Sequence, residues 1–334
     1  MGSGIKRGIL QSRGLGDIVI ALPIARWYYE QGDEIFWPIC EEFLPSFEES
    51  VPWITWIGVE TDKEGRFFLE TPLRDLTRLG VKEADLLYLY QYLNARPDLT
   101  NLDYWHMMKF DQYKYAMARV PFREKWRLDR CITRDPVREK ALLDQLGIRA
   151  GDRYMLYQGR ASDIAYNLDL SSIDPAVRKI EITALTDVIF DWLGAIEGAE
   201  SLVLIDSVFA NLIDQLGLCK NSQLTYVRKW NRTVDGNPVL LGDWKYLPVG
   251  QPAGTEPPGA RVDPAVETQK MRAVMSQAAA ARAAPSGLTS HVPFAVNKKV
   301  YPTSFLDAVK KPQQGGQPKM SSALDLYKQL GVKY

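Results

Sequence analysis

The fold is decided by residues 5–31, IKRGILQSRGLGDIVIALPIARWYYEQ, near the start of the chain. Residues 5–11 predict a buried strand, and residues 12–17 have the glycines and polar side chains of a turn. Apolar residues then recur with helical spacing over residues 18–31. A strand that leads into a helix through a glycine-containing turn is typical of the first unit of an α/β domain.

The same alternation continues along the chain. Apolar runs predict further strands at 34–39, 54–59, 85–90, 153–158, 178–182, 201–205 and 223–228, the last of which we expect to be the final strand. Helical patterns occupy 102–118, 135–147, 187–197 and 208–217, and the helix at 135–147 has Asp135 as N-cap and Pro136 in its first turn. This order predicts mostly parallel sheets with helices on their faces.

The chain has 334 residues, more than a domain with a single hydrophobic core usually has, and this length suits two domains and a tail. We expect an N-terminal domain over 1–134 and a second domain over 135–250. From residue 251 the composition changes, and nine of the 20 prolines lie within 252–318. Residues 251–334 are therefore predicted to form a linker and an irregular tail.

The charge balance bears on the class of partner. Lys+Arg and Asp+Glu both total 41, so no overall field attracts the protein to nucleic acid or to an anionic membrane. Residues 285–334 differ, because they hold seven lysines against two aspartates, a net charge of +5. This segment is either a solvated tail or a basic arm for an anionic partner.

Cysteines and histidines are few. Cys40, Cys131 and Cys219 lie far apart, which indicates neither a disulfide framework nor a metal-ligand spacing. Histidines occur only at positions 106 and 291, so we expect no metal site.

The sequence has no signal-peptide pattern, and no apolar stretch approaches the roughly 18 residues of a membrane span. Together these features favour a cytoplasmic protein.

The turn Gly14-Leu15-Gly16-Asp17 is the first candidate site. Glycine lets a ligand approach the backbone, and the following helix offers unpaired N–H groups and the positive end of its dipole. Asp17 would then lie at the carboxyl edge of the sheet, where α/β proteins bind ligands. The alternative is an ordinary turn capped by Asp17. Val19 stands where Gly-x-Gly-x-x-Gly needs its last glycine, which disfavours an NAD-dependent oxidoreductase.

The second candidate site lies in residues 192–217, WLGAIEGAESLVLIDSVFANLIDQLG. Ser207 is suited to cap the helix at 208–217, whose first-turn N–H groups suit a diphosphate. Asp206, at the end of the strand, is placed to accept hydrogen bonds from sugar hydroxyls. The alternative is that Asp206 and Ser207 merely cap the helix and that Asn211 has no special role.

A third candidate is Gln158-Gly159-Arg160-Ala161-Ser162, after the strand at 153–158. A glycine, a cation and a hydroxyl at a strand end suit a phosphate-binding loop, so Gly159, Arg160 and Ser162 are predicted to contact the donor. A solvated Arg160 is the alternative.

Later strand ends add candidates at the same edge of the sheet. Glu181 ends the strand at 178–182, and Tyr226 and Arg228 lie at the end of the strand at 223–228. Gly16 is also a donor-site candidate. A shared site requires the turns at Asp17 and Asp206 to meet in space.

Two of these segments, in this order, resemble the heptosyltransferase-like glycosyltransferases, the family of ADP-heptose:lipopolysaccharide heptosyltransferases. That family has Gly-Asp followed by an apolar helix with Ala-Leu-Pro, as in Gly16-Asp17 and Ala21-Leu22-Pro23 here. Its second segment has an alanine, an apolar strand, Asp-Ser/Thr-Gly, two residues and then His. This chain keeps Asp206 and Ser207 but has Val208 and Asn211 in place of the glycine and the histidine.

The resemblance implies a GT-B fold, in which two Rossmann-like domains face each other across a cleft and bind the acceptor and the donor, respectively. It also implies metal-independent, inverting transfer of a sugar from a nucleotide diphosphate, without a cofactor and with Asp17 as general base. Arg160 is the candidate for the family's phosphate-binding lysine, and Asn211 can donate through its amide. No Asp-x-Asp, the metal-bridging motif of the other main glycosyltransferase architecture, occurs in the chain.

The acceptor and the activity leave alternatives open. The resemblance implies a saccharide acceptor, whereas the basic tail is compatible with a hydroxymethylated nucleic-acid base, the substrate of DNA glucosyltransferases that share this fold. A non-catalytic nucleotide-binding protein is the alternative from another functional class, because a fold does not fix a function.

Overall fold

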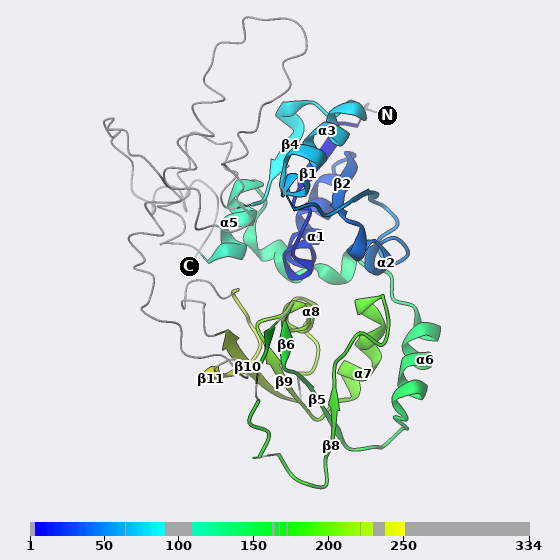
Figure 1. Cartoon of the computed structure of the whole chain (residues 1–334), viewed down its shortest axis with the longest axis vertical. Coiled ribbons are helices and arrows are strands. Elements are labelled where there is room, and N and C mark those ends of the chain that lie inside the picture. The colour runs from blue at the N-terminus through cyan, green and yellow to red at the C-terminus, as the bar shows by residue number, and fades with distance from the viewer. Residues whose placement is uncertain are drawn as a thin grey trace, which may run out of the picture.

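The computed structural model describes residues 4–63, 65–90, 109–161, 164–166, 168–171, 173–220, 222–229 and 238–250. These residues form two α/β halves, each built on a sheet whose paired strands all run parallel (Figure 1). The prediction of two parallel sheets with helices on their faces is thus confirmed. The predicted tail, 251–334, lies outside the described residues.

The first sheet has the strand order β3-β2-β1-β4. Its strands are β1 (Lys6–Leu10), β2 (Glu34–Cys40), β3 (Thr55–Val59) and β4 (Leu86–Tyr88). Its helices are α1 (Leu15–Tyr29), α2 (Leu44–Phe47) and α3 (Glu70–Arg78), with the 3₁₀ helices η1 (Glu41–Phe43), η2 (Arg66–Phe68) and η3 (Glu83–Asp85).

Both faces of this sheet are buried. Successive strand residues point to opposite sides of a sheet, and here the side chains on each side belong to an apolar cluster. Ile9 and Trp37 belong to the large core that includes α1. Leu10 and Phe36, their neighbours in sequence, pack on the other face with Leu76 of α3. The near-continuous apolar runs of the sequence therefore reflect strands that are covered on two sides.

The halves are joined by a helical stretch made of α5 (Phe110–Met117), η5 (Phe122–Trp126), η6 (Leu128–Arg130) and α6 (Pro136–Leu146). The carboxylate of Asp135 accepts hydrogen bonds from the backbone N–H groups of Val137 and Arg138, which confirms the predicted N-cap. The helix predicted at 102–118 is described only from residue 110, because residues 91–108 lie outside the described part. The predicted domain boundary near 134 falls within this connecting stretch.

The second sheet has the strand order β11-β10-β9-β5-β8. An antiparallel pair, β6 and β7, follows β5 in sequence. The strands of the sheet are β5 (Tyr154–Gln158), β8 (Arg178–Glu181), β9 (Ser201–Ile205), β10 (Gln223–Lys229) and β11 (Trp244–Gly250). The small pair is β6 (Arg160–Ala161) and β7 (Ile164–Ala165), and the helices are η7 (Ile189–Trp192), α7 (Leu193–Gly198) and α8 (Val208–Leu216).

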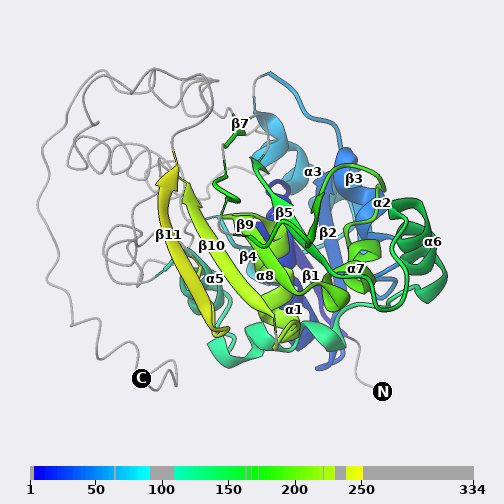
Figure 2. The ribbon, with the colours of Figure 1, turned by 90° about the horizontal axis from the view of Figure 1, so that it is seen from below.

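Two expectations for this half are corrected. The strand at 223–228 is not the last, since β11 pairs with β10 and forms the edge of the sheet (Figure 2). The helix predicted at 187–197 is split into η7 and α7, so its first turn is 3₁₀ rather than α-helical.

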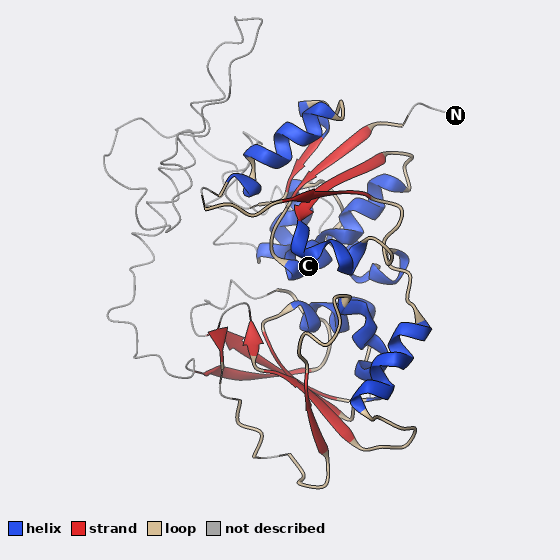
Figure 3. Cartoon of the chain, turned by 45° about the vertical axis from the view of Figure 1, so that its right-hand side comes forward, coloured by secondary structure: helices blue, strands red, loops and turns tan. Residues whose placement is uncertain are grey.

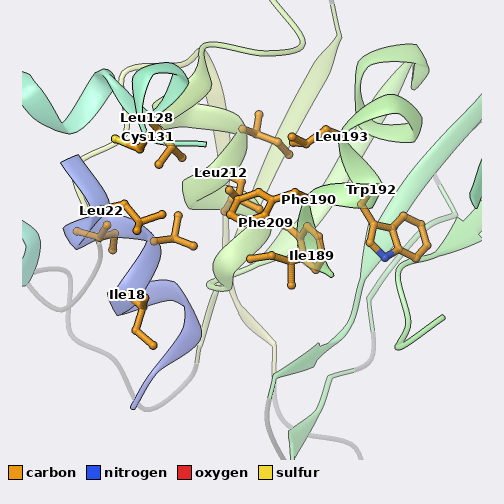
Figure 4. Close-up of a cluster of buried hydrophobic side chains, with 14 of the residues drawn as sticks. Ile18, Leu22, Leu128, Cys131, Ile189, Phe190, Trp192, Leu193, Phe209 and Leu212 are labelled. Carbon is orange, nitrogen blue, oxygen red and sulfur yellow. The ribbon is translucent and has the colours of Figure 1, made fainter. Parts of the chain in front are cut away.

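The two halves face each other through their helices, and Figure 3 shows most of the helices between the two sheets. Helices α1 and α8 pack directly on each other. Ile18 and Leu22 of α1 share one apolar cluster with Phe209 and Leu212 of α8 (Figure 4). Full burial of such side chains stabilises by about 1.5–3 kcal/mol each, so this contact fixes how the starts of the two helices meet.

Candidate active site

The turn between β1 and α1 is held by buried hydrogen bonds. The hydroxyl of Ser12 donates to the carbonyl oxygen of Phe67 over 2.5 Å and lies 3.0 Å from the hydroxyl of Tyr90. The Tyr90 hydroxyl also accepts from the backbone N–H of Arg13 over 2.8 Å. Desolvation by burial raises the pKa of Tyr90, so its phenol stays protonated. The backbone that leads into α1 is therefore anchored before the helix begins.

Asp17 lies in the first turn of α1, as predicted, with 36% of its side chain exposed. One carboxylate oxygen, Oδ2, is so close to Gly14 that a Cβ on Gly14 would come within 2.5 Å of it. Gly14 also has φ of +87°, a conformation that favours glycine. The other oxygen, Oδ1, lies 3.1 Å from Nζ of Lys114, a residue that the sequence did not single out.

The turns at Asp17 and Asp206 meet, as the sequence-based interpretation required. A Cβ built on Gly16 would lie 3.6 Å from both the backbone nitrogen and the Cα of Val208, which is ordinary van der Waals contact. Gly16 directly precedes Asp17, and Val208 is the first residue of α8. The residue that precedes the partly exposed Asp17 on one half is therefore in contact with the first residue of a helix on the other.

At the start of α8, Ser207 occupies the N-cap position but makes no capping hydrogen bond through its side chain. Its Oγ is buried and has no hydrogen-bond partner among the described residues. Gln158 ends the neighbouring strand β5, opposite Leu204 of β9, and its Oε1 is likewise buried without a partner in the described part of the chain. Asp206 is itself buried, and its backbone N–H bonds to the carbonyl oxygen of Val227.

Unpaired buried polar atoms are uncommon in folded proteins and call for an explanation such as a bound water, ion or ligand. Here two of them lie at the carboxyl ends of adjacent parallel strands, where open α/β sheets bind ligands. The predicted capping bond of Ser207 is wrong, whereas its predicted place at the edge of the sheet is as expected.

Asn211 is turned inward. Its amide Nδ2 donates to the carbonyl oxygen of Ser207 over 3.1 Å, within the first turn of α8, and only 3% of the residue is exposed. Its Oδ1 has no partner among the described residues. Oδ1 is a hydrogen-bond acceptor, and a phosphate oxygen is an acceptor too, so these two atoms would not bond to each other. The amide nitrogen has a second N–H, so donation from Asn211 to a phosphate stays a prediction.

The segment after β5 is a hairpin rather than an open phosphate-binding loop. Arg160 pairs with Ala165 across β6 and β7, and the backbone N–H of Tyr166 bonds to the carbonyl oxygen of Gly159 over 2.7 Å. Gly159 is buried, and a Cβ there would lie 3.0 Å from the Tyr166 carbonyl oxygen. Arg160 is exposed, while Ser162 lies outside the described residues.

Three candidates remain, one at the sheet edge, one in the core and one in β10. Glu181 is half-buried and ends β8, next to β5, so its place at the carboxyl edge is as expected. Tyr226 is 0% exposed and packs against the rings of Trp244 and Tyr246, so the structure places it in the core. Arg228 lies in β10, but its side chain is not among the described ones.

The described residues have neither a cluster of metal ligands nor a helix that could span a membrane. They contain no group of three or more His, Cys, Asp or Glu side chains arranged to hold a metal ion. None of their helices has the length and apolar character needed to cross a membrane.

The chain is similar in structure to two solved proteins. One is a glycosyl transferase family 9 protein from Veillonella parvula, with 14% sequence identity, a TM-score of 0.47, and coverage of 74% of this chain and 88% of that chain. The other is E. coli heptosyltransferase WaaC with ADP, with 10% identity, a TM-score of 0.35, and coverage of 73% and 91%. No protein-family model and no curated protein sequence matches the chain. Similarity at this level concerns the fold, so reaction and substrate have to be argued from the residues of this chain.

Proposed function

We propose that the protein is a glycosyltransferase that uses a nucleotide diphosphate sugar as donor. The observation that carries the proposal is the contact between Gly16 and Val208, which joins the Asp17 turn to the start of α8. One turn offers a carboxylate with an accessible oxygen, and the other offers a helix N-terminus beside a buried hydroxyl without a partner among the described residues. A proton acceptor next to an anion-binding element is what transfer from a diphosphate to a hydroxyl requires.

In the proposed reaction, the acceptor hydroxyl loses its proton to Asp17 as its oxygen attacks the anomeric carbon. The bond from that carbon to the diphosphate oxygen breaks at the same time, and the bonding electrons leave with the nucleoside diphosphate. Direct displacement from the opposite side inverts the anomeric configuration. The negative charge that develops on the leaving group would be stabilised by the α8 dipole, with the exposed Arg160 as the predicted cation.

The proposed donor site combines predicted and newly identified residues. Ser207 can donate its hydroxyl hydrogen to a phosphate oxygen, and Asp206 and Glu181 lie at the edge where sugar hydroxyls would bind. Gln158 joins them because its amide ends the strand beside Ser207 and has an oxygen without a partner among the described residues. We propose metal-independent transfer because the sequence lacks Asp-x-Asp.

A two-part experiment tests the proposal. In the first part, UDP, ADP and GDP are added during thermal unfolding, and the matching nucleotide should stabilise the protein by about 2.7 kcal/mol at a hundredfold excess over Kd. In the second part, release of nucleoside diphosphate is measured from UDP-glucose, ADP-glucose and GDP-mannose in the presence of saccharide acceptors.

Asp17→Asn separates catalysis from binding in this experiment. It should lower turnover by about 10²–10⁴-fold, the usual contribution of a general base, and leave nucleotide binding intact. Asp144→Asn is the matched control, because Asp144 is an exposed helix carboxylate whose one ion-pair partner among the described residues is Lys140, and it should change neither property. Nucleotide binding without turnover would favour the non-catalytic alternative, and turnover that survives in Asp17→Asn would remove Asp17 from the mechanism.

A saccharide is the acceptor proposed here. The nucleic-acid alternative depends on the lysines of 285–334, which lie outside the described residues, and nothing in the described part of the chain favours it.

A further inference from the structure

Lys114, in α5, is a buried cation next to the proposed general base, with only 2% of its side chain exposed. Its Nζ donates to Oε1 of Gln11 over 2.5 Å and to the carbonyl oxygen of Leu89 over 3.1 Å. The third oxygen near Nζ is Oδ1 of Asp17, at 3.1 Å. Two of the three N–H donors of the ammonium are thus hydrogen-bonded to neutral oxygens, and its contact with Asp17 is an ion pair.

The charge of Lys114 has a single compensating partner among these contacts. Gln11 and Leu89 supply neutral oxygens, whereas Asp17 supplies a carboxylate. Burying an ammonium is costly, and an apolar side chain of similar volume is often as stable or more stable at such a position. A lysine here is therefore poorly explained by packing alone, and its contact with Asp17 offers a reason for its presence.

The two oxygens of Asp17 have different surroundings. Oδ1 faces the ammonium of Lys114, while Oδ2 lies over the turn glycine Gly14. No hydrogen bond to Oδ2 is made by the described residues, and the side chain is partly open to solvent. The carboxylate is thus held through one oxygen and offers the other.

We propose that Lys114 is a positioning residue for transfer, which fixes the Asp17 carboxylate through Oδ1 so that Oδ2 receives the proton of the acceptor hydroxyl. Lys114 does not touch the substrates, and it acts only through Asp17. The inference rests on the proposed function, because it assigns a role within that reaction.

A double-mutant cycle tests this role, since two residues that act as one unit give non-additive losses. Release of nucleoside diphosphate is measured for wild type, Lys114→Met, Asp17→Asn and the double variant, with whichever of UDP-glucose, ADP-glucose and GDP-mannose the wild type uses. Lys114→Met should lower kcat by about 10–100-fold and change KM for the donor by less than about threefold, because misplacement of a reacting group affects the rate. In the Asp17→Asn background the same substitution should cause less than about a twofold further loss.

Lys125 provides the matched control. It is a fully buried lysine that pairs with the fully buried Asp111 over 2.7 Å, and no contact with Asp17 is recorded for it. Any loss in Lys125→Met should therefore multiply with the loss in Asp17→Asn. If Lys114→Met fails to fold, Lys114→Gln, which keeps an N–H donor for Leu89, takes its place in the cycle.

The outcomes separate this inference from the proposed function. A kcat in Lys114→Met within twofold of wild type, or losses that multiply with Asp17→Asn, would overturn the positioning role while transfer itself stands. Absence of release by the wild type from all three donors would overturn the proposed function and the catalytic role of Lys114 together. In that case a cycle in the free energy of unfolding would still show whether the two charges are coupled in the folded protein.

Discussion

Two glycines of the same turn should respond in opposite ways to replacement by alanine. In Gly14→Ala, the new methyl group would be 2.5 Å from Oδ2 of Asp17, so the carboxylate has to move by about 1 Å to reach a normal contact distance. The φ of +87° at this position adds about 1–2 kcal/mol of strain for any residue with a Cβ. In Gly16→Ala, the methyl group would meet Val208 at 3.6 Å, an ordinary contact, and alanine favours the helix over glycine by about 0.5–1 kcal/mol.

The comparison needs two measurements on each variant. Urea denaturation should show that Gly14→Ala lowers the free energy of unfolding by about 1–2 kcal/mol and that Gly16→Ala leaves it unchanged or raises it slightly. Release of nucleoside diphosphate should fall about 100-fold in Gly14→Ala, because a 1 Å displacement of a reacting group can cost that much, and stay near wild type in Gly16→Ala.

Wild-type stability together with wild-type turnover in Gly14→Ala would contradict the crowding of Gly14 by Asp17. That result would mean that Oδ2 of Asp17 does not lie over Gly14 in solution. A loss of stability without a loss of turnover would separate the strain of the turn from the position of the carboxylate, and Asp17 would then need another role.

Three further predictions concern the hydroxyl at the start of α8, a buried ion pair and the behaviour of the protein at alkaline pH. Ser207→Ala should change the free energy of unfolding by less than about 0.5 kcal/mol, instead of the usual loss of about 1 kcal/mol, because the hydroxyl makes no capping bond, and calorimetry should show weaker nucleotide binding. Asp111→Asn should lose about 3–5 kcal/mol in urea denaturation, because it leaves the ammonium of Lys125 buried without its charged partner, and a loss below 1 kcal/mol would contradict the burial of this pair. Desolvation raises the pKa of Cys40 and of Cys219 to about 11, so the folded state binds these protons more tightly than the unfolded state. Their contribution to stability should be complete below about pH 8.5 and be lost as the pH rises toward 11, and a flat stability profile from pH 8 to 10.5 would contradict it.

The elements of the fold could be predicted where a local pattern determines them. The strand, turn and helix at 5–31 follow from apolar spacing and from the glycines, and they appear as β1 and α1. Strand β11 was missed because residues 244–250 include Pro248 and carry little alternation of their own. It forms by pairing with β10, and Trp244 packs edge-on against Tyr226, so its stability comes from tertiary contact rather than from local preference.

The same distinction applies to the candidate site. Asp17 and Asp206 could be found because each follows a predicted strand, and the carboxyl ends of parallel strands share an edge. Lys114 could not, because it lies 103 residues from Gln11 and stands between two tyrosines in a helix without any motif. The hairpin after β5 was also not predictable, since the glycine and the cation of 158–162 fit a loop equally well.

The departures of this chain from the heptosyltransferase-like pattern at positions 208 and 211 have a common explanation in the contact of α1 with α8. Val208 packs against Gly16 of α1, so the valine at position 208 is part of the contact between the two helices. Asn211 is 3% exposed in the same interface and bonds within its own helix. Ser207, the N-cap of α8, and Gln158, at the end of β5, have buried polar atoms without partners in the described part of the chain, and there we propose that the diphosphate binds. The proposed donor site thus includes the end of β5 as well as the start of α8, and it is joined to the other half where Gly16, the residue before the proposed proton acceptor Asp17, meets Val208.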